Sequence, residues 1–266
     1  MISRSEEAKG VGAKTPNTRT LDTDAARIEP ANHYGDGVVR DPYWARRVKT
    51  NADLLRPYFK PGGRLLEVGC YVGDLAEFLP DDLNLVGYDY DSTALEQAAS
   101  RGYETHQINL DRDPLELEGK FDYAVCTEVL EHLVEPHRVL HSIAKCLKPD
   151  GKVVISLPNE NTIYHRLMAL FGVGVDMCAF ELYKHLHFPT VRQAKNFVGT
   201  YFDLEQVSYY VNPRAEGSRI EKLGPLLMLM PNAGWDTLAK VMPGLFARGT
   251  IMLGTPKNPL PEMKRV

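Results

Sequence analysis

The sequence has no excess of basic residues, and this absence bears on its partners. Its 31 Lys and Arg are fewer than its 35 Asp and Glu, which gives a formal net charge of −4 at pH 7. Binding to a nucleic-acid backbone needs a positive surface field that neutralises phosphates. We therefore expect no nucleic-acid partner.

Cysteine is also scarce, and no hydrophobic run is long enough to cross a bilayer. Cys70, Cys126, Cys146 and Cys178 show no CxxC spacing and stand in apolar segments, which favours buried free thiols over disulfides or zinc ligands. The polar N-terminus offers no apolar core for a signal peptide. These features predict a cytoplasmic protein without a transmembrane segment.

The distribution of apolar residues predicts three regions along the chain. Residues 1–30 contain almost no large apolar side chains, so we expect a disordered tail there. Spaced apolar and aromatic positions in residues 31–60 indicate a helix that covers the edge of the core. Residues 61–266 form the main domain, with insertions at about 159–189 and 213–245, which are too long for tight connections.

Short strands alternate with helices from Arg64 onward. The strands read "RLLEV", "NLVGYD", "YETHQI", "FDYAVC" and "KVVISLP", and the helices between them include "GDLAEFL", "STALEQAAS" and "EPHRVLHSIAKCLKPDG". This order predicts right-handed crossovers and a largely parallel sheet. A later unit begins with a helix in which Thr190 and Gln193 have the capping-box spacing, and it continues into the strands "FDLEQVSYYV" and "ARGTIMLGTP".

A glycine-containing turn joins the first strand to the first helix. The segment "LLEVGCYVGDLAEFL" leaves the strand at Glu67 and turns through Gly69 and Gly73. Glycines let a ligand approach the main chain, and free N–H groups at a helix start favour an anionic ligand group. A purely structural turn gives the same pattern. Asp89, about 20 residues further on, ends the next strand, where a carboxylate can accept both hydroxyls of a ribose.

These segments together resemble a known family. In this order, "LLEVGCYVGDLAEFL", "LVGYDYDSTALEQA", "FDYAVCTEVLEHL" and "CLKPDGKVVISLPN" are similar to the successive motifs of class I S-adenosylmethionine-dependent methyltransferases. The resemblance extends over about 64–159. It is closest to ubiquinone-biosynthesis-type O-methyltransferases and to proteins similar to the methionine-biosynthesis protein W, whose later region also resembles "LYKHLHFPTVRQAKNF".

The resemblance implies a fold and a cofactor. The fold is an α/β, Rossmann-like, mostly parallel seven-stranded sheet with helices on both faces and an insertion or lid near the acceptor site. The cofactor is S-adenosylmethionine, which leaves as S-adenosylhomocysteine. The matched residues would bind it: Gly69, Cys70 and Gly73 at the methionine part, Glu67 at its ammonium, Asp89 and Tyr90 at the ribose, Asn109, Leu110 and Asp111 at the adenine, and Thr127 and Glu128 closing the pocket.

Tyr71 departs from the family pattern, which has a second glycine at this position. Its ring either crowds the cofactor or lies beside the positive sulfonium, since aromatic faces attract cations. We include Tyr71 among the cofactor-binding residues.

The acceptor side is less defined by the sequence. Methyl transfer from a sulfonium is an in-line displacement, so the protein aligns an acceptor and, for a hydroxyl, removes its proton. His185 and His187 lie two apart, on one side of an extended segment with Tyr183, and we take these three as catalytic candidates. Structural histidines bonded to backbone carbonyls are the alternative.

We expect no metal, although one set of residues keeps that option open. Glu128, Glu131 and His132 have the i, i+3, i+4 spacing, and a similar set in the resembled ubiquinone-type enzymes is associated with a divalent ion. Bracing of the loop by these side chains is the alternative interpretation.

We therefore expect an enzyme that methylates a small molecule, with oxygen as the acceptor atom. "LLMLMP" and Trp235 indicate an apolar or amphipathic acceptor. A cofactor-binding subunit that acts through a partner protein is the alternative function. A nicotinamide-dependent dehydrogenase is a third, but its first turn reads GxGxxG, whereas this chain reads GxxxG. The sequence leaves a homodimer open.

Overall fold

A computed structural model describes residues 42–115, 120–172, 185–211 and 232–264, with no side-chain description for 42–44 and 232–233. The predicted tail at 1–30, the catalytic candidate Tyr183, Cys178 and the "LLMLMP" segment lie outside these residues. The described residues all belong to one unit of the chain, Val38–Val266.

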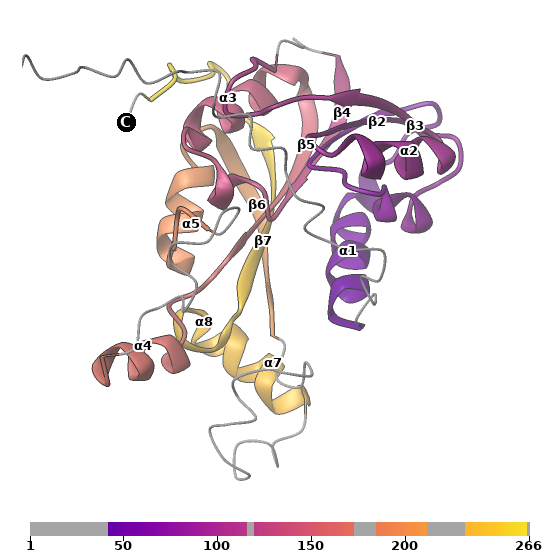
Figure 1. The fold of residues 1–266 in the computed structure, drawn as a ribbon. Coiled ribbons are helices and arrows are strands. Elements are labelled where there is room, and N and C mark those ends of the chain that lie inside the picture. Colours follow the sequence, from indigo (N-terminus) through magenta and orange to yellow (C-terminus); the bar gives the residue numbers. More distant parts are fainter. Residues whose placement is uncertain (1–41, 116–119, 173–184, 212–231, 265–266) are drawn as a thin grey trace, which may run out of the picture. The chain divides into compact units, whose positions relative to one another are not determined.

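Seven strands form one sheet in the order β3-β2-β1-β4-β5-β7-β6 (Figure 1). The strands β1 to β5 run parallel to one another, while β7 is antiparallel to both β5 and β6. The predicted Rossmann-like, mostly parallel sheet is confirmed. The strands are β1 (Arg64–Val68), β2 (Asn84–Asp89), β3 (Tyr103–Gln107), β4 (Phe121–Thr127), β5 (Leu147–Pro158), β6 (Phe202–Tyr210) and β7 (Gly249–Pro256).

Helices cover both faces of the sheet, because alternate strand residues point to opposite sides. The described helices are α1 (Pro42–Leu55), α2 (Ser92–Ser100), α3 (Pro136–Cys146), α4 (Ile163–Leu170), α5 (Val191–Val198), α7 (Asn232–Val241) and α8 (Pro243–Phe246), with short 3-10 helices η2 (Arg56–Tyr58), η3 (Asp74–Phe78) and η4 (Leu130–His132).

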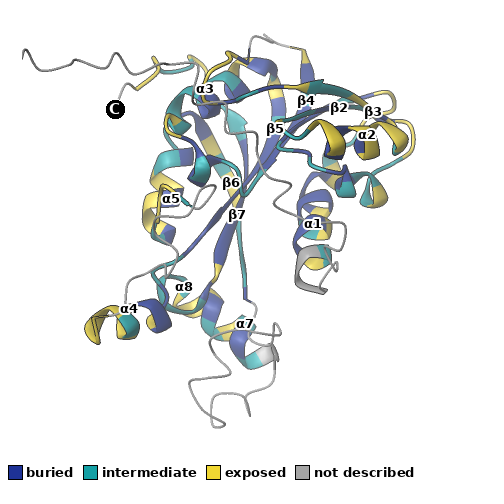
Figure 2. Cartoon of the chain, viewed as in Figure 1, coloured by how far each residue is buried: buried dark blue, intermediate teal, exposed yellow. Residues whose placement is uncertain are grey.

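Two apolar clusters hold these layers together. In one, the buried stripe of α3 and residues of α5 pack on Leu66, Ala124 and Ile155. In the other, α1 packs on Leu65 and Val125, the sequence neighbours that face the other side. The central strands β1, β4 and β7 are buried along most of their length, whereas β2, β3 and β6 are more exposed (Figure 2).

The connection after β1 differs from the sequence prediction. The segment "GDLAEFL" forms only the five-residue 3-10 helix η3, with Gly73 in the left-handed conformation at its start. A helix this short offers few aligned N–H groups, so the electrostatic attraction expected for an anionic ligand group is weak here. By contrast, the predicted capping box of α5 is present in full, with Thr190 and Gln193 bonded reciprocally.

The insertions contribute α4, α7 and α8, whereas 173–184 and 212–231 lie outside the described residues. Trp235 on α7 is buried in a small cluster with Val211, Ala239 and Ala247. It therefore packs in the core of this insertion rather than standing free for an acceptor. None of the described helices has the length and apolar character needed to span a bilayer.

Candidate functional site

A pocket lies where β1 and β4 end, at the edge of the sheet at which parallel α/β folds bind ligands. The empty space between its lining atoms, with open solvent included, amounts to about 360 Å³. Its wall is formed by the β1 loop, by the last residue of β4 and by the inner face of α1, and its lining residues are Val48, Asn51, Glu67, Gly69, Cys70, Tyr71, Asp74, Leu75 and Thr127.

The loop from β1 to η3 has an unusual backbone. Gly69, Tyr71 and Gly73 have φ values of 76°, 47° and 74°, in the region that favours glycine. At Gly69 a Cβ atom would stand 2.2 Å from Cγ2 of Val129, so any other residue would force the Val129 side chain to shift. Tyr71 takes this conformation despite its side chain, and its N–H donates to Oδ2 of Asp89 at 2.7 Å. Strain of this kind concentrates at functional sites.

Acidic side chains give this pocket its electrostatic character. Glu67 is buried and accepts a hydrogen bond from the Tyr103 hydroxyl. Burial, with the nearby charges of Asp74 and Asp89 adding to it, raises the pKa of Glu67 to about 8. Burial likewise raises the pKa of Asp89, against the hydrogen bonds from the N–H groups of Asp91 and Tyr71. Asp74 pairs with Arg101.

No Lys, Arg or His side chain is among the described residues that line the pocket. A pyrophosphate would meet the carboxyl groups of Glu67 and Asp74, of which only Asp74 is paired with a cation, Arg101, whereas an ammonium or sulfonium would be attracted to both. The expectation of an anionic ligand group at this turn thus finds no cationic side chain among the described lining residues, and it stays a prediction. The residues present fit the positively charged methionine part of S-adenosylmethionine.

The predicted ribose and adenine residues follow β2 and β3. Tyr90 is 40% exposed, next to Asp89. Asn109 and Asp111 build a turn, in which the Asn109 side chain accepts from the Asp111 N–H at 3.0 Å and Asp111 accepts from the Val134 N–H at 2.8 Å. Leu110 is buried in the core. Contact of this group with an adenine stays a prediction.

Thr127 and Glu128, expected to close the pocket together, take different positions. Thr127 lines it and accepts a hydrogen bond from the Asn51 side chain at 2.9 Å. The Glu128 carboxylate is held by Ser156 at 2.7 Å, by Tyr210 at 2.9 Å and by Arg47 at 3.1 Å. A cofactor contact of Glu128 stays a prediction.

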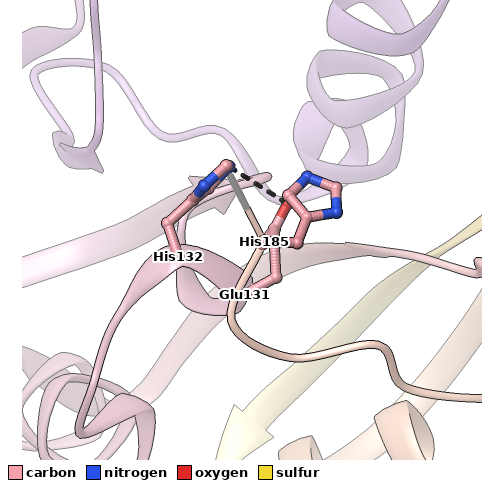
Figure 3. Close-up of side chains that lie close together, drawn as sticks. All are labelled: Glu131, His132 and His185. Atoms are coloured by element: carbon pink, nitrogen blue, oxygen red, sulfur yellow. Dashed lines mark ion pairs between the residues drawn. The ribbon is translucent and has the colours of Figure 1, made fainter. Parts of the chain in front are cut away.

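A second cluster of polar side chains lies just beyond, where β4 and β5 end. Glu131, His132 and His185 each place one potential ligand atom within 4.8 Å of the others. Figure 3 shows both imidazole rings beside the Glu131 carboxylate. Nδ1 of His185 lies 2.8 Å from the Glu160 carboxylate. Burial, with the charge of Glu128 adding to it, raises the pKa of Glu131 well above its usual range.

The segment that carries His185 is docked by its main chain. The N–H groups of Leu186 and His187 donate to the carbonyl of Glu131 at 2.8 and 3.1 Å. The Nε2 atom of His187 lies 2.9 Å from the Leu133 carbonyl oxygen. The two histidines that the sequence grouped together thus have different partners, and only His185 joins the cluster.

The structure changes one residue of the alternative metal-binding set Glu128, Glu131 and His132. Glu128 does not join Glu131 and His132, because its carboxylate is bonded to Arg47, Ser156 and Tyr210. His185 stands in its place among the described residues.

Several site residues were not predicted. Val48 and Asn51 lie on the face of α1 that lines the pocket, and no pattern in the sequence indicates which face this is. Asp74 follows Gly73 directly, and its acidic side chain at the turn was a usable signal. Glu160 lies two residues after β5, in an insertion without a recognisable motif, so the sequence does not indicate its place in the cluster.

Comparisons with known proteins identify the family to which the chain belongs. A family model described as "Methyltransferase domain" matches residues 40–204. The ubiquinone biosynthesis O-methyltransferase of Erwinia tasmaniensis is 34% identical over 119 residues, which are 42% of this chain and 48% of that protein. The namesake from Vibrio cholerae is 30% identical over 173 residues, 60% of this chain and 70% of that protein. The chain thus spans about half the length of the first of these relatives.

Among solved structures, magnesium protoporphyrin IX methyltransferase from Synechocystis with bound SAH superposes with a TM-score of 0.52. The alignment covers 80% of this chain and 83% of that chain at 15% identity, which supports the fold alone. Since the family model covers more than half of the sequence, the chain belongs to the methyltransferase domain family and has the Rossmann-like fold of class I S-adenosylmethionine-dependent methyltransferases.

Proposed function

We propose that this protein transfers a methyl group from S-adenosylmethionine to a hydroxyl oxygen of a small molecule. The observation that carries the proposal is the acidic pocket at the end of β1, with Glu67 and Asp74 in its wall and no described cationic side chain. The cofactor supplies an activated methyl group on a positively charged sulfur, and it also carries an ammonium. A pocket of this charge favours both groups.

The residues of the pocket have separable tasks. The backbone of the Gly69–Gly73 loop offers close approach to the methionine part, and Glu67 faces its ammonium. Asp89 accepts the ribose hydroxyls, and in the present structure it fixes the loop through the Tyr71 N–H. The Tyr71 ring lines the pocket and presents an aromatic face to the sulfonium.

We assign the acceptor site to the cluster of Glu131, His132, His185 and Glu160. A hydroxyl must lose its proton on methylation, and imidazole and carboxylate groups are the side chains that accept it. His185 is the catalytic candidate that the cluster retains. His187 is bonded to a backbone carbonyl and we assign it a docking role, while Tyr183 stays a prediction outside the described residues. Oxygen as the acceptor atom is supported by the two relatives named O-methyltransferases.

Calorimetric titration with S-adenosylhomocysteine and with NAD tests the cofactor. The purified chain is expected to bind the first with micromolar affinity and the second not at all. Binding of NAD alone would overturn the proposal.

The acceptor is tested with cofactor that carries a labelled methyl group. Phenols, catechols and aliphatic alcohols form one panel, and amines and thiols of the same carbon skeletons form the matched control. Label transfer to the hydroxyl compounds is expected. Transfer to the amines or thiols alone would refute oxygen as the acceptor atom. Cofactor binding without transfer, together with a protein captured stoichiometrically by the chain, would instead identify a subunit that acts through a partner.

A further inference from the structure

Glu131 is an unusual residue for the core of a protein. It is 1% exposed, and neither of its carboxylate oxygens has a hydrogen-bond partner. Leaving such a group without a partner costs several kcal/mol, so a buried carboxylate normally has a counter-ion or coordinates a metal. The charges of Arg47, Glu128 and Glu160 also act on its carboxyl. The side chains that form ion pairs with it are the imidazoles of His132 and His185, whose Nε2 atoms lie 3.9 and 3.8 Å from its Oε1 atom.

We propose that Glu131, His132 and His185 bind one divalent transition-metal ion, with Glu160 as the residue that orients His185. Ligand atoms bound to such an ion at about 2.1 Å stand roughly 3 to 3.4 Å from one another. The observed separations from Oε1 exceed this by less than about 1 Å, which small side-chain rotations supply. The site is thus open by the amount expected for side chains that close around an ion.

Glu160 supplies the second feature of a metal site. Its Oε1 atom lies 2.8 Å from Nδ1 of His185, on the opposite edge of the ring from the Nε2 atom that faces Glu131. Metal-binding histidines usually donate their other ring N–H to a carboxylate, which fixes the tautomer and the ring orientation. Glu160 therefore holds His185 with Nε2 free of its proton and directed at the ion.

The donor set also selects the metal. Two imidazoles and one carboxylate suit Zn²⁺, Co²⁺, Mn²⁺ or Fe²⁺, whereas Mg²⁺ prefers oxygen ligands alone. The set differs from the one that the family resemblance implies, because Glu128 is engaged elsewhere and His185 comes from a segment more than 50 residues later in the chain. A bound ion of this kind would replace His185 as the group that activates the acceptor: it would polarise a coordinated hydroxyl, whose proton would then pass to water. This catalytic use rests on the proposed function, but the binding site itself does not.

The test is metal binding by the full chain, measured without cofactor or acceptor. Metal-free protein is titrated with Zn²⁺, Mn²⁺ and Mg²⁺ by calorimetry, and with Co²⁺ by its visible absorption bands, which report nitrogen ligands directly. One ion per chain is expected, with Zn²⁺ and Co²⁺ bound at least about 100-fold more tightly than Mg²⁺. The substitution His185→Ala is expected to weaken Co²⁺ binding at least about 100-fold. Glu160→Gln is expected to weaken it by about 10- to 100-fold.

His187→Ala is the matched control, because this histidine lies two residues away in the same docked segment and bonds only a backbone carbonyl in the described structure. It is expected to retain the wild-type affinity and Co²⁺ spectrum. Absence of binding by the wild-type protein, unchanged affinity in His185→Ala, or equal losses in both histidine variants would overturn the proposal. None of these results would affect S-adenosylhomocysteine binding, so a failed metal site and a failed cofactor assignment are distinguishable.

Discussion

Replacing Glu67 with glutamine is expected to stabilise the fold and weaken the cofactor site at the same time. Burial raises the pKa of Glu67 to about 8 from an ordinary value of 4.5. A group whose pKa is higher in the folded state stabilises the fold fully below its unfolded pKa, and this contribution is lost as the pH rises through the folded value. Between these values, the folded protein must hold a proton on Glu67 that the unfolded chain has released.

The magnitude follows from 1.36 kcal/mol for each pH unit of separation. For wild-type protein the cost is about 1 kcal/mol at pH 5 and about 4 kcal/mol at pH 7.5. Glutamine is nearly isosteric, its amide oxygen can still accept from Tyr103, and it never titrates. The variant Glu67→Gln should therefore exceed wild type in free energy of unfolding by about these amounts, measured by urea denaturation at both pH values.

Ligand binding supplies the second half of the test. A bound ammonium favours the ionised form of Glu67, so wild-type protein should release close to one proton per S-adenosylhomocysteine at pH 7, seen by calorimetry in buffers of different ionisation enthalpy. Glu67→Gln should release none and bind more weakly. A stability difference that does not grow between pH 5 and pH 7.5 would refute the burial argument, and equal proton release would refute the ammonium contact.

Three further predictions concern the loop and the scaffold. Asp89→Asn should weaken S-adenosylhomocysteine binding by about 2 kcal/mol, roughly 30-fold. The substitution removes charge-assisted hydrogen bonds to the ribose and weakens the hydrogen bond from the Tyr71 N–H. Unchanged affinity in calorimetry would show that Asp89 does not bind the cofactor. Gly69→Ala should lower the free energy of unfolding by about 2 to 4 kcal/mol, and adding Val129→Ala should recover part of this loss. If the double variant shows no recovery, backbone strain at residue 69 causes the loss, and the contact of the new Cβ atom with Val129 does not. Thr190→Ala should cost about 1 kcal/mol of stability in thermal melts without changing cofactor affinity, since it removes only the cap of α5; a loss of affinity would contradict the separation of this helix from the pocket.

The sheet could be predicted from the sequence because each strand carries a local signal. "RLLEV", "NLVGYD" and "FDYAVC" are apolar runs between turn residues, and the stripe of α3 has helical spacing, so patterns of two to four residues determine these elements. The capping box of Thr190 and Gln193 is equally local. Such signals survive in a single sequence.

The site could be predicted only in the part that lies on one βαβ unit. Glu67, Gly69 and Thr127 are placed by strand ends, whereas Asn51 enters the pocket through the packing of α1, which no local pattern records. The sequence prediction also failed at η3, where the spacing of apolar residues in "GDLAEFL" predicts a longer helix but only Asp74–Phe78 forms one, as a 3-10 helix. Likewise, the meeting of Glu131 with His185 depends on a contact across more than 50 residues.

The docking of residues 185–188 uses the main chain, and this has a consequence for variation. The N–H groups of Leu186 and His187 hold the segment to the Glu131 carbonyl whatever side chains stand there. Any residue except proline preserves these two bonds. Leu186, which is 55% exposed, is therefore a position where the side chain can be exchanged in a designed library, whereas Phe188 is retained because its ring lies beside that of His185. The segment thus offers a position for varying the proposed acceptor site without altering the β1 loop.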